Sequence, residues 1–336
     1  MNFFITGGSG FIGVHLANLI REEYPTSKIY NLDIEKQEDK HLRLKNYNSP
    51  LTKNSVVPSE YVHCDVRKKI ENLPVPVSED DVLIHLAAIH QTPGFEDVEY
   101  FETNIRGAEN VVDFAERYGI RSIVFMSSIS VYGTSETMKV EDSLPMPNTP
   151  YGISKLVSEK LFMGWQKAKS NRKLVILRPG VVFGKGENGN FTRMYWAIRK
   201  HRFAYPGRKD TIKACIYVKD LVRFILFCMK KDENLQLFNC GYEPAYQLEQ
   251  IVKTMKEATN LSSFVPYVPN FLIMPAAVVL GLLGSPMGIC RDRVVKLQIS
   301  TNVSGKKMSE SGFEYKWTFE KALKDWFSDN EEKELR

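Results

Sequence analysis

The sequence of 336 residues has few of the features that mark specialised protein classes. Its five cysteines form no CxxC pair and have no histidine cluster beside them, which argues against a disulfide framework and a zinc site. We predict no bound metal, and reduced thiols indicate the cytoplasm. The N-terminus has no basic region ahead of its first apolar residues, so a signal peptide is not expected.

A strong excess of charge of one sign is also missing. The 45 Lys and Arg residues face 40 Asp and Glu residues, and the basic ones are scattered apart from short clusters such as residues 67–69. We interpret them as ordinary solvated surface and predict no nucleic-acid partner. The sequence has no internal repeats, and its 43% apolar and 25% charged residues are typical of a soluble globular protein.

No transmembrane segment is predicted. The candidate, residues 271–283, has 13 residues and contains Pro275, whereas a membrane-spanning helix needs about 20 apolar residues. We interpret the segment as a buried or partly buried helix. A contact with a lipid surface or with a second subunit is the alternative.

What the sequence does contain is a glycine-rich turn, TGGSGFIG at residues 6–13, between an apolar run and an apolar-periodic run. Strand, turn and helix in this order are the context of a dinucleotide-binding fingerprint. Gly7 permits the tight turn, Gly10 admits a pyrophosphate close to the backbone, and Gly13 lets the helix pack on the strand. The first N–H groups of the helix offer partial positive charge to the phosphates.

An acidic residue stands at the distance that this fingerprint requires. Asp33 ends the next predicted strand, residues 28–33, and follows Gly13 by 20 residues. A carboxylate there accepts hydrogen bonds from the adenosine ribose and repels a 2′-phosphate, which favours NAD over NADP. The alternative is a glycine turn of some other α/β protein, with Asp33 as a solvated strand end.

The first half of the chain alternates apolar strands with helical patterns. Further strands are predicted at 61–66, 81–88, 122–128 and 173–179, helices at about 98–118 and from about 151, and a surface excursion around a helix at 35–59. The alternation predicts an α/β fold with a Rossmann-type, doubly wound parallel sheet and a ligand at the carboxyl ends of its strands.

The rhythm changes after about residue 180, where glycine-rich and basic loops alternate with short helices. We therefore expect residues 1–180 to form the NAD-binding domain, with later segments returning to it. Residues 181–336 are expected to form mainly a smaller substrate-binding lobe.

A tyrosine and a lysine four residues apart are the candidate catalytic pair. Tyr151 and Lys155 share one face of a predicted helix. The ammonium favours the phenolate, which can exchange a proton with a substrate hydroxyl while a hydride moves to or from nicotinamide. Ser128, at the end of the fifth strand, can hydrogen-bond the same substrate oxygen; its alternative role is a bond to local backbone.

With these motifs in place, the chain resembles the extended short-chain dehydrogenases/reductases, specifically the NAD-dependent sugar-nucleotide epimerase/dehydratase family. The resemblance covers about residues 1–245, with a weaker match near 291–313. The segments that carry it are 6–13, Asp33, 64–66, 85–88, 103–110, 127–133, 151–155, 178–180, 217–221 and 238–241.

The resemblance implies NAD as cofactor, catalysis by Ser128, Tyr151 and Lys155, and a homodimer formed through two helices. It places Asp65 and Val66 beside the adenine and Pro179 near the nicotinamide. The cofactor-binding residues that it implies are Gly7, Gly10, Phe11, Ile12, Gly13, Asp33, Asp65, Val66, Leu86, Ala87, Ala88, Asn104, Tyr151, Lys155 and Pro179.

Departures from the family pattern narrow the reaction. Dehydratases of the family carry an adjacent Asp-Glu pair where this chain has Ile129 and Ser130, so we predict against 4,6-dehydration. The substrate-binding residues that the resemblance implies, besides Ser128, are Val181 in place of an asparagine, Lys213 in place of an arginine, and Arg291 or Arg293. Lysine keeps the charge but loses the bidentate geometry. The alternative for Lys213, Arg291 and Arg293 is that each is an ordinary solvated cation on the protein surface.

We predict an NAD-dependent epimerase or 4-keto reductase that acts on a nucleotide-diphosphate sugar. One alternative is a hydroxysteroid-type alcohol dehydrogenase or ketone reductase, which the wording RPGVVFG at residues 178–184 also resembles. The other is a non-catalytic NAD-binding module. The sequence does not distinguish epimerase from reductase, because both use the same three residues.

Overall fold

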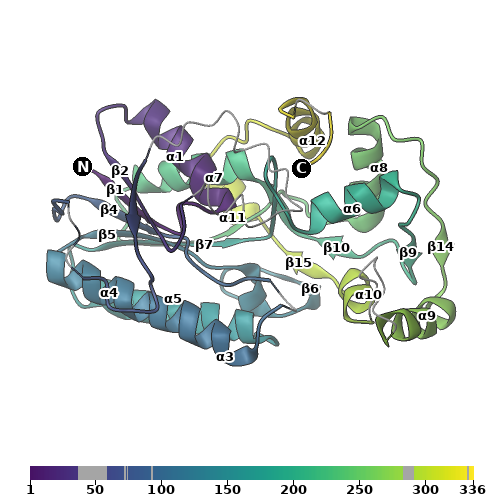
Figure 1. Cartoon of the computed structure of the whole chain (residues 1–336), viewed down its shortest axis with the longest axis horizontal. Helices are drawn as coiled ribbons and strands as arrows, with labels where there is room; N and C mark the ends of the chain where they lie inside the picture. Colours follow the sequence, from purple (N-terminus) through teal and green to yellow (C-terminus); the bar gives the residue numbers. More distant parts are fainter. Residues whose placement is uncertain (37–58, 72, 74, 92–93, 283–290, 331–332) are drawn as a thin grey trace.

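A seven-stranded sheet, parallel throughout, organises the protein (Figure 1). The computed structural model describes residues 1–36, 59–71, 73, 75–91, 94–282, 291–330 and 333–336. In spatial order the strands are β12 (Leu235–Cys240), β7 (Lys173–Pro179), β5 (Ser122–Met126), β4 (Val82–His85), β1 (Phe3–Thr6), β2 (Ile29–Asp33) and β3 (Glu60–His63).

Helices cover both faces of this sheet (Figure 1). Figure 1 shows α1 (Phe11–Glu23) and α7 (Val218–Met229) on one face, and α4 (Arg106–Tyr118) and α5 (Pro150–Lys167) on the other. A short α3 (Asp97–Tyr100) and a π-helical turn (Phe101–Ile105) lead into α4.

Two separate cores follow from the alternation of side chains along the strands. Phe3 and Ile5 pack into the core that contains the buried faces of α1 and α7. Phe4, which lies between them, packs into the core of α4 and α5, with its ring 6.3 Å from that of Phe114. Successive residues of a strand point to opposite faces, so strands buried on both sides are apolar throughout.

Smaller sheets build the second lobe, which lies to the right in Figure 1. One has four strands: β13 (Tyr246–Gln247), β10 (Ile212–Lys213), β15 (Thr301–Val303) and β6 (Ser135–Lys139). Two strand pairs are β11 (Cys215–Tyr217) with β8 (Val181–Phe183) and β14 (Tyr267–Val268) with β9 (Tyr205–Pro206). Within the described residues, the other α-helices are α6 (Asn190–Arg199), α8 (Leu248–Ala258), α9 (Asn270–Leu282), α10 (Arg291–Gln298), α11 (Lys306–Glu310) and α12 (Phe319–Ser328).

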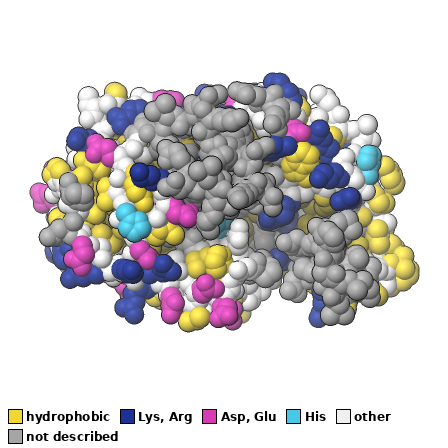
Figure 2. Space-filling model, in the orientation of Figure 1, with side chains coloured by type: hydrophobic (Ala, Val, Ile, Leu, Met, Phe, Trp, Pro, Cys, Tyr) yellow, Lys and Arg dark blue, Asp and Glu magenta, His cyan; other side chains and the backbone are white. Residues whose placement is uncertain are grey.

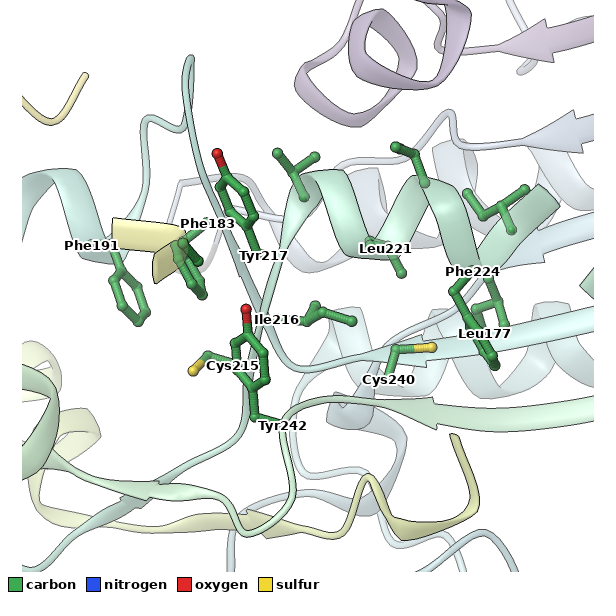
Figure 3. Close-up of a cluster of buried hydrophobic side chains, with 14 of the residues drawn as sticks. Leu177, Phe183, Phe191, Cys215, Ile216, Tyr217, Leu221, Phe224, Cys240 and Tyr242 are labelled. Atoms are coloured by element: carbon green, nitrogen blue, oxygen red, sulfur yellow. The ribbon is translucent and has the colours of Figure 1, made fainter. Parts of the chain in front are cut away.

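An aromatic cluster joins the two lobes (Figure 3). Phe183 of β8 stacks on Phe191 of α6 at 4.7 Å and lies 5.5 Å from Tyr217 of β11. Figure 3 shows this cluster continuing along α7 to Leu177 of the large sheet. One continuous buried core therefore connects the sheet with the second lobe.

The strands and helices expected in the first half are present; β2 and β7 end where predicted, but β3, β4 and β5 end two or three residues earlier. β4 ends at His85 and β5 at Met126, because the residues that follow leave the sheet and form loops at its carboxyl edge. Among the later segments, β12 is an edge strand of the large sheet and α7 covers one of its faces; β12 was not anticipated as a strand. The expected helix within 35–59 lies outside the described residues.

Candidate active site

The glycine turn has the geometry that the sequence predicted. Gly7 has φ +72°, and a Cβ there would lie 2.7 Å from the backbone nitrogen of Ala87. A Cβ on Gly13 would lie 2.6 Å from the Cα of Gly8, so any side chain would push the helix off the turn. Both positions require glycine, the first for conformation and space and the second for close packing.

The start of α1 is open to a phosphate. Its N-cap is Gly10, and no side chain caps the helix. A Cβ on Gly10 would approach only the carbonyl oxygen of Gly7, at 3.1 Å. Phe11 and Ile12 form the first turn and are half-buried. Uncapped N–H groups at a helix start suit an anion, so this turn fits the pyrophosphate of a dinucleotide.

Asp33 stands beside the turn at the carboxyl end of β2. Its carboxylate accepts a hydrogen bond from the Ser9 backbone N–H at 3.1 Å, and the side chain is buried. Ser9 is held in turn by Asn31, whose amide donates to the Ser9 hydroxyl at 2.9 Å. The acid is therefore fixed against the phosphate-binding turn, as recognition of a ribose requires.

The residues expected beside the adenine lie further along the same edge. Asp65 lines a surface pocket together with Ile34 and Cys64, beyond the ends of β2 and β3. Its carboxylate accepts two hydrogen bonds from the Arg67 guanidinium, each 2.8 Å long, and this pairing lowers the pKa of Asp65. Val66 is buried, and a Cβ on Gly107 would reach it at 3.1 Å.

Asn104 supports the cofactor-binding loop from behind. Its side chain accepts a hydrogen bond from the Ile89 N–H at 2.9 Å and donates to the Ile89 carbonyl and to the Ser154 hydroxyl of α5. These bonds hold the loop that contains Leu86, Ala87 and Ala88 against α5. All polar groups of the Asn104 side chain are engaged, so the structure gives it a positioning role.

The three candidate catalytic residues meet at the carboxyl end of β5. Tyr151 is in the first turn of α5, which Thr149 caps by accepting a hydrogen bond from the Gly152 N–H. Ser128 follows the end of β5, and its hydroxyl lies close enough to the Tyr151 phenol to lower the pKa of that phenol. One turn further along α5, the Lys155 ammonium donates to the Met126 carbonyl, the last residue of β5, at 2.8 Å.

Burial dominates the protonation of this group. Burial raises the pKa of the Tyr151 phenol to about 12. The Ser128 hydroxyl acts in the opposite direction and lowers this pKa, whereas Tyr100 raises it further. Burial also lowers the pKa of Lys155 to about 7, while Glu159 raises it. The groups of the protein thus raise the pKa of the phenol, where the sequence pattern led us to expect a decrease, because Lys155 bonds a carbonyl and is itself shielded from water.

A buried ion pair behind the site was not anticipated. Glu159 follows Lys155 by one turn and pairs with Arg178 of β7 through bonds of 2.8 and 2.6 Å, and both side chains are buried. Glu159 also accepts a hydrogen bond from Ser127, the neighbour of Ser128. The signal in the sequence was the spacing, since Tyr151, Lys155 and Glu159 recur every four residues on one helix face.

Pro179 ends β7 and pairs with Cys240, next to the catalytic group at the same edge. Val181 is half-buried in β8, and its N–H donates to the Ala214 carbonyl at 2.9 Å. The neighbouring Lys213 donates to the carbonyls of Lys296 and Ile299, at the carboxyl end of α10, at 2.7 and 2.6 Å. Burial lowers the pKa of Lys213 to about 8.

The two alternatives for the diphosphate arginine, Arg291 and Arg293, are in the first turn of α10, at the opposite end of this helix from Lys213. Arg291 is exposed in the first turn of α10. The side chain of Arg293 lies outside the described part of the structure. Lys213 and Arg291 are therefore not brought together, and Lys213 stabilises the end of α10.

In the parts of the chain that the structure describes, no group of three His, Cys, Asp or Glu side chains could hold a metal ion. Cys64, Cys215, Cys228 and Cys240 are buried free thiols, and Cys290 lies outside the described residues.

A doubly wound parallel sheet, a dinucleotide-type glycine turn and a Ser–Tyr–Lys group at one edge define the class of extended short-chain dehydrogenases/reductases. Within it, the chain belongs to the NAD-dependent epimerase/dehydratase family, whose family model matches residues 3–241. The family uses NAD, which agrees with the preference that Asp33 indicates.

Relatives and solved structures agree with this assignment. The chain is 26% identical over 96% of its length to an Escherichia coli enzyme named N-acetyl-alpha-D-glucosaminyl-diphospho-ditrans,octacis-undecaprenol 4-epimerase, of which it covers 93%. It is 26% identical over 79% of its length to the mouse dTDP-D-glucose 4,6-dehydratase, of which it covers 77%. The fold matches the UDP-glucose 4-epimerase of Thermotoga maritima with a TM-score of 0.72 and 22% identity, over 98% of this chain and 99% of that one.

Proposed function

We propose that the protein is an NAD-dependent 4-epimerase of a sugar that is linked to a diphosphate. The observation that carries this proposal is the convergence of Ser128, Tyr151 and Lys155 at the carboxyl end of β5, on the same sheet edge as the glycine turn and Asp33. Relatives over most of the chain are named as enzymes of diphosphate-linked sugars.

In this reaction the Tyr151 oxygen takes the proton from a ring hydroxyl, and the Ser128 hydroxyl hydrogen-bonds the same sugar oxygen. When bound, NAD supplies the hydride acceptor and donor and a positive charge on the nicotinamide. A positive charge near a phenol lowers its pKa, which offsets the burial of Tyr151. Tyr151 returns its proton to the same oxygen at the end of the reaction.

Epimerisation is favoured over dehydration by the residues after Ser128. Ile129 is buried, and Ser130 is tied to Ser128 through both its N–H and its hydroxyl. Neither side chain can carry a proton at neutral pH as the acidic pair of the dehydratases does. Because one relative is named as a dehydratase, an assay for loss of water from the sugar tests the preference for epimerisation directly.

The carrier of the sugar is either a nucleotide or a polyprenol. A polyprenol is favoured by the relative that matches across 96% of the chain, through α9 and α10. The relative named for a dTDP-sugar matches across 79%. Lys213, whose ammonium is bonded to the end of α10, does not distinguish the two carriers, because both join the sugar through a diphosphate.

Tyr151→Phe tests the mechanism. We expect NAD binding, measured by calorimetry, to persist and turnover to fall at least about a hundredfold, because the proton acceptor is lost. The assay offers UDP-N-acetylglucosamine and polyprenyl-diphospho-N-acetylglucosamine in separate reactions, which identifies the carrier. Undiminished turnover in the variant contradicts the mechanism. If the wild-type protein oxidises a steroid alcohol and does not bind UDP, the hydroxysteroid-type alternative is favoured.

We also propose a cytoplasmic homodimer. The exposed apolar residues Ile153 and Val157 of α5 and Val98 of α3 support a subunit contact on the outer helical face. The buried, unpaired thiols of the described cysteines suit a reducing compartment.

A further inference from the structure

The far end of the second lobe exposes large apolar side chains. Phe264 is 80% exposed and Phe271 is 75% exposed. Together with three further exposed residues they form what we name the α9 surface: Phe264, Tyr267, Phe271, Leu272 and Val278. Figure 2 shows hydrophobic side chains gathered at the right-hand end, where Figure 1 places β14 and α9, with basic side chains nearby.

A well-bonded scaffold presents this surface. β14 pairs with β9, and the Tyr267 hydroxyl donates to the Gly207 carbonyl at 2.9 Å. The Asn270 side chain, at the start of α9, accepts a hydrogen bond from Gln298 of α10. Ala277 of α9 and Val294 of α10 are buried. The helix therefore has a buried side, and Phe271, Leu272 and Val278 are displayed on the other.

Exposed basic side chains lie at the same end of the second lobe (Figure 2). Arg202 precedes Tyr205 by three residues, and Phe264 precedes Tyr267 by three, where Tyr205 and Tyr267 are partners in a parallel pair. Lys200, His201 and Arg202 are exposed at the end of α6, and within the described residues no ion pair joins Lys200 or Arg202 to a carboxylate. The surface is thus apolar with a basic margin.

We propose that the α9 surface docks on a phospholipid bilayer that contains anionic lipid. No helix in the described ranges is long and apolar enough to cross a membrane, and α9 has 13 residues with Pro275 inside it. In this docking mode the exposed aromatic rings enter the acyl boundary, and the cations of the basic margin meet anionic headgroups.

Charge distinguishes this occupant from a second copy of the chain. A two-fold contact would place the surface against itself, because such contacts are isologous. The basic margin of one copy would then face that of the other, and like charges repel. An anionic bilayer offers the opposite charge to the same margin. Docking does not depend on the catalytic proposal, and it is measured without turnover.

Flotation with vesicles tests the proposal. The full-length protein is mixed with phosphatidylcholine vesicles or with vesicles that also contain about a third phosphatidylglycerol, and the bound fraction is measured at low and high salt. We expect binding to the anionic vesicles that weakens with salt. Phe271→Glu should reduce the partition coefficient about tenfold, and Lys200→Ala and Arg202→Ala about fivefold each.

Leu144→Glu is the matched control, because Leu144 is 74% exposed on the loop between β6 and α5, outside the α9 surface. It should leave binding unchanged. Circular dichroism shows whether each variant is folded, and light scattering gives its mass. Failure of the protein to float with anionic vesicles overturns the proposal, as does equal loss in Leu144→Glu and Phe271→Glu. A halved mass in Phe271→Glu also overturns it, because the surface would then be a subunit contact.

Discussion

Lys155 is a candidate catalytic residue whose buried ammonium also lowers the stability of the fold. Its ammonium is buried, donates to the Met126 carbonyl, and lies 5.0 Å from the centre of the Phe125 ring. Such surroundings solvate a cation poorly, which is why burial lowers the pKa to about 7. A lysine with that pKa changes charge near neutral pH.

This shift makes stability depend on pH. The pKa of Lys155 is about 7 in the folded protein and about 10.4 in an unfolded chain. Between these pH values the unfolded state binds more protons than the folded state, so the free energy of unfolding rises with pH. The stability gained in this way disappears as the pH falls toward 7. Relative to Lys155→Met, we expect the wild type to gain about 1 kcal/mol per pH unit from roughly pH 8 to 9.5.

Urea unfolding of both proteins across that range measures the difference, in which the other titrating groups cancel. Parallel stability curves for the wild type and Lys155→Met would contradict the assignment of the charge change to this residue.

Helix α5 is the element on which the site depends. One of its faces carries Tyr151 and Lys155 toward the sheet edge, and Glu159 of the same face anchors it to Arg178 of β7 and to Ser127. The Arg178 guanidinium also donates to the Tyr132 hydroxyl at 2.6 Å. A single buried network therefore ties the helix, the end of β5 and β7 together.

Breaking this network should destabilise the protein strongly. Arg178→Met leaves the Glu159 carboxylate buried without its partner, and we expect a loss of about 3–5 kcal/mol in the free energy of unfolding. Adding Glu159→Leu to that variant should recover part of the loss, because it removes the unpaired charge. Chemical denaturation gives both values.

The exposed pair Lys324–Glu320 provides the comparison, since each side chain is more than half exposed. Lys324→Met should cost less than about 0.5 kcal/mol. A similar small cost for Arg178→Met would mean that the buried network does not hold α5 in place.

At the scale of the molecule, two apolar surfaces lie on different lobes and are expected to have different partners. The outer face of α5 exposes Ile153 and Val157. The α9 surface lies at the far end of the other lobe, where Figure 2 shows hydrophobic side chains. We assign the first to a second subunit and the second to a bilayer.

Subunit association through α5 predicts that Val157→Glu converts a dimer into a monomer, because each two-fold contact would bury two new charges. Light scattering after gel filtration gives the mass. Leu235→Glu is the control, as Leu235 is also exposed but lies at the start of β12. A monomeric wild type, or a Val157→Glu dimer, would refute this contact.

Local signals made much of the fold predictable. The glycine turn, Asp33 and the apolar strands are read from neighbouring residues, and the structure confirms their elements. β12 was missed because Gln236 and Asn239 interrupt its apolar pattern. Both side chains are buried because each has a hydrogen-bond partner. Gln236 donates to the Cys228 carbonyl of α7, and the Asn239 side chain accepts a hydrogen bond from the Tyr132 hydroxyl. These partners are distant in the sequence.

The substrate side of the site was less predictable for the same reason. Lys213 matches a family position for a diphosphate cation, but its ammonium is used by the end of α10, some 80 residues later. Asn104 matches a cofactor position, but its amide holds Ile89 and Ser154. Which group a polar side chain meets depends on packing between elements.

The sequence by itself determined the class of the protein and its cofactor, because turn geometry, strand periodicity and the spacing of Tyr151 and Lys155 act over a few residues. The tertiary structure decided the pKa directions, the anchoring of α5 by Arg178, the bonding of Lys213 to α10, and the exposure of Phe271, Leu272 and Val278 on α9. Burial and charge pairing depend on residues that only folding brings together, and these properties therefore cannot be read from spacing along the chain.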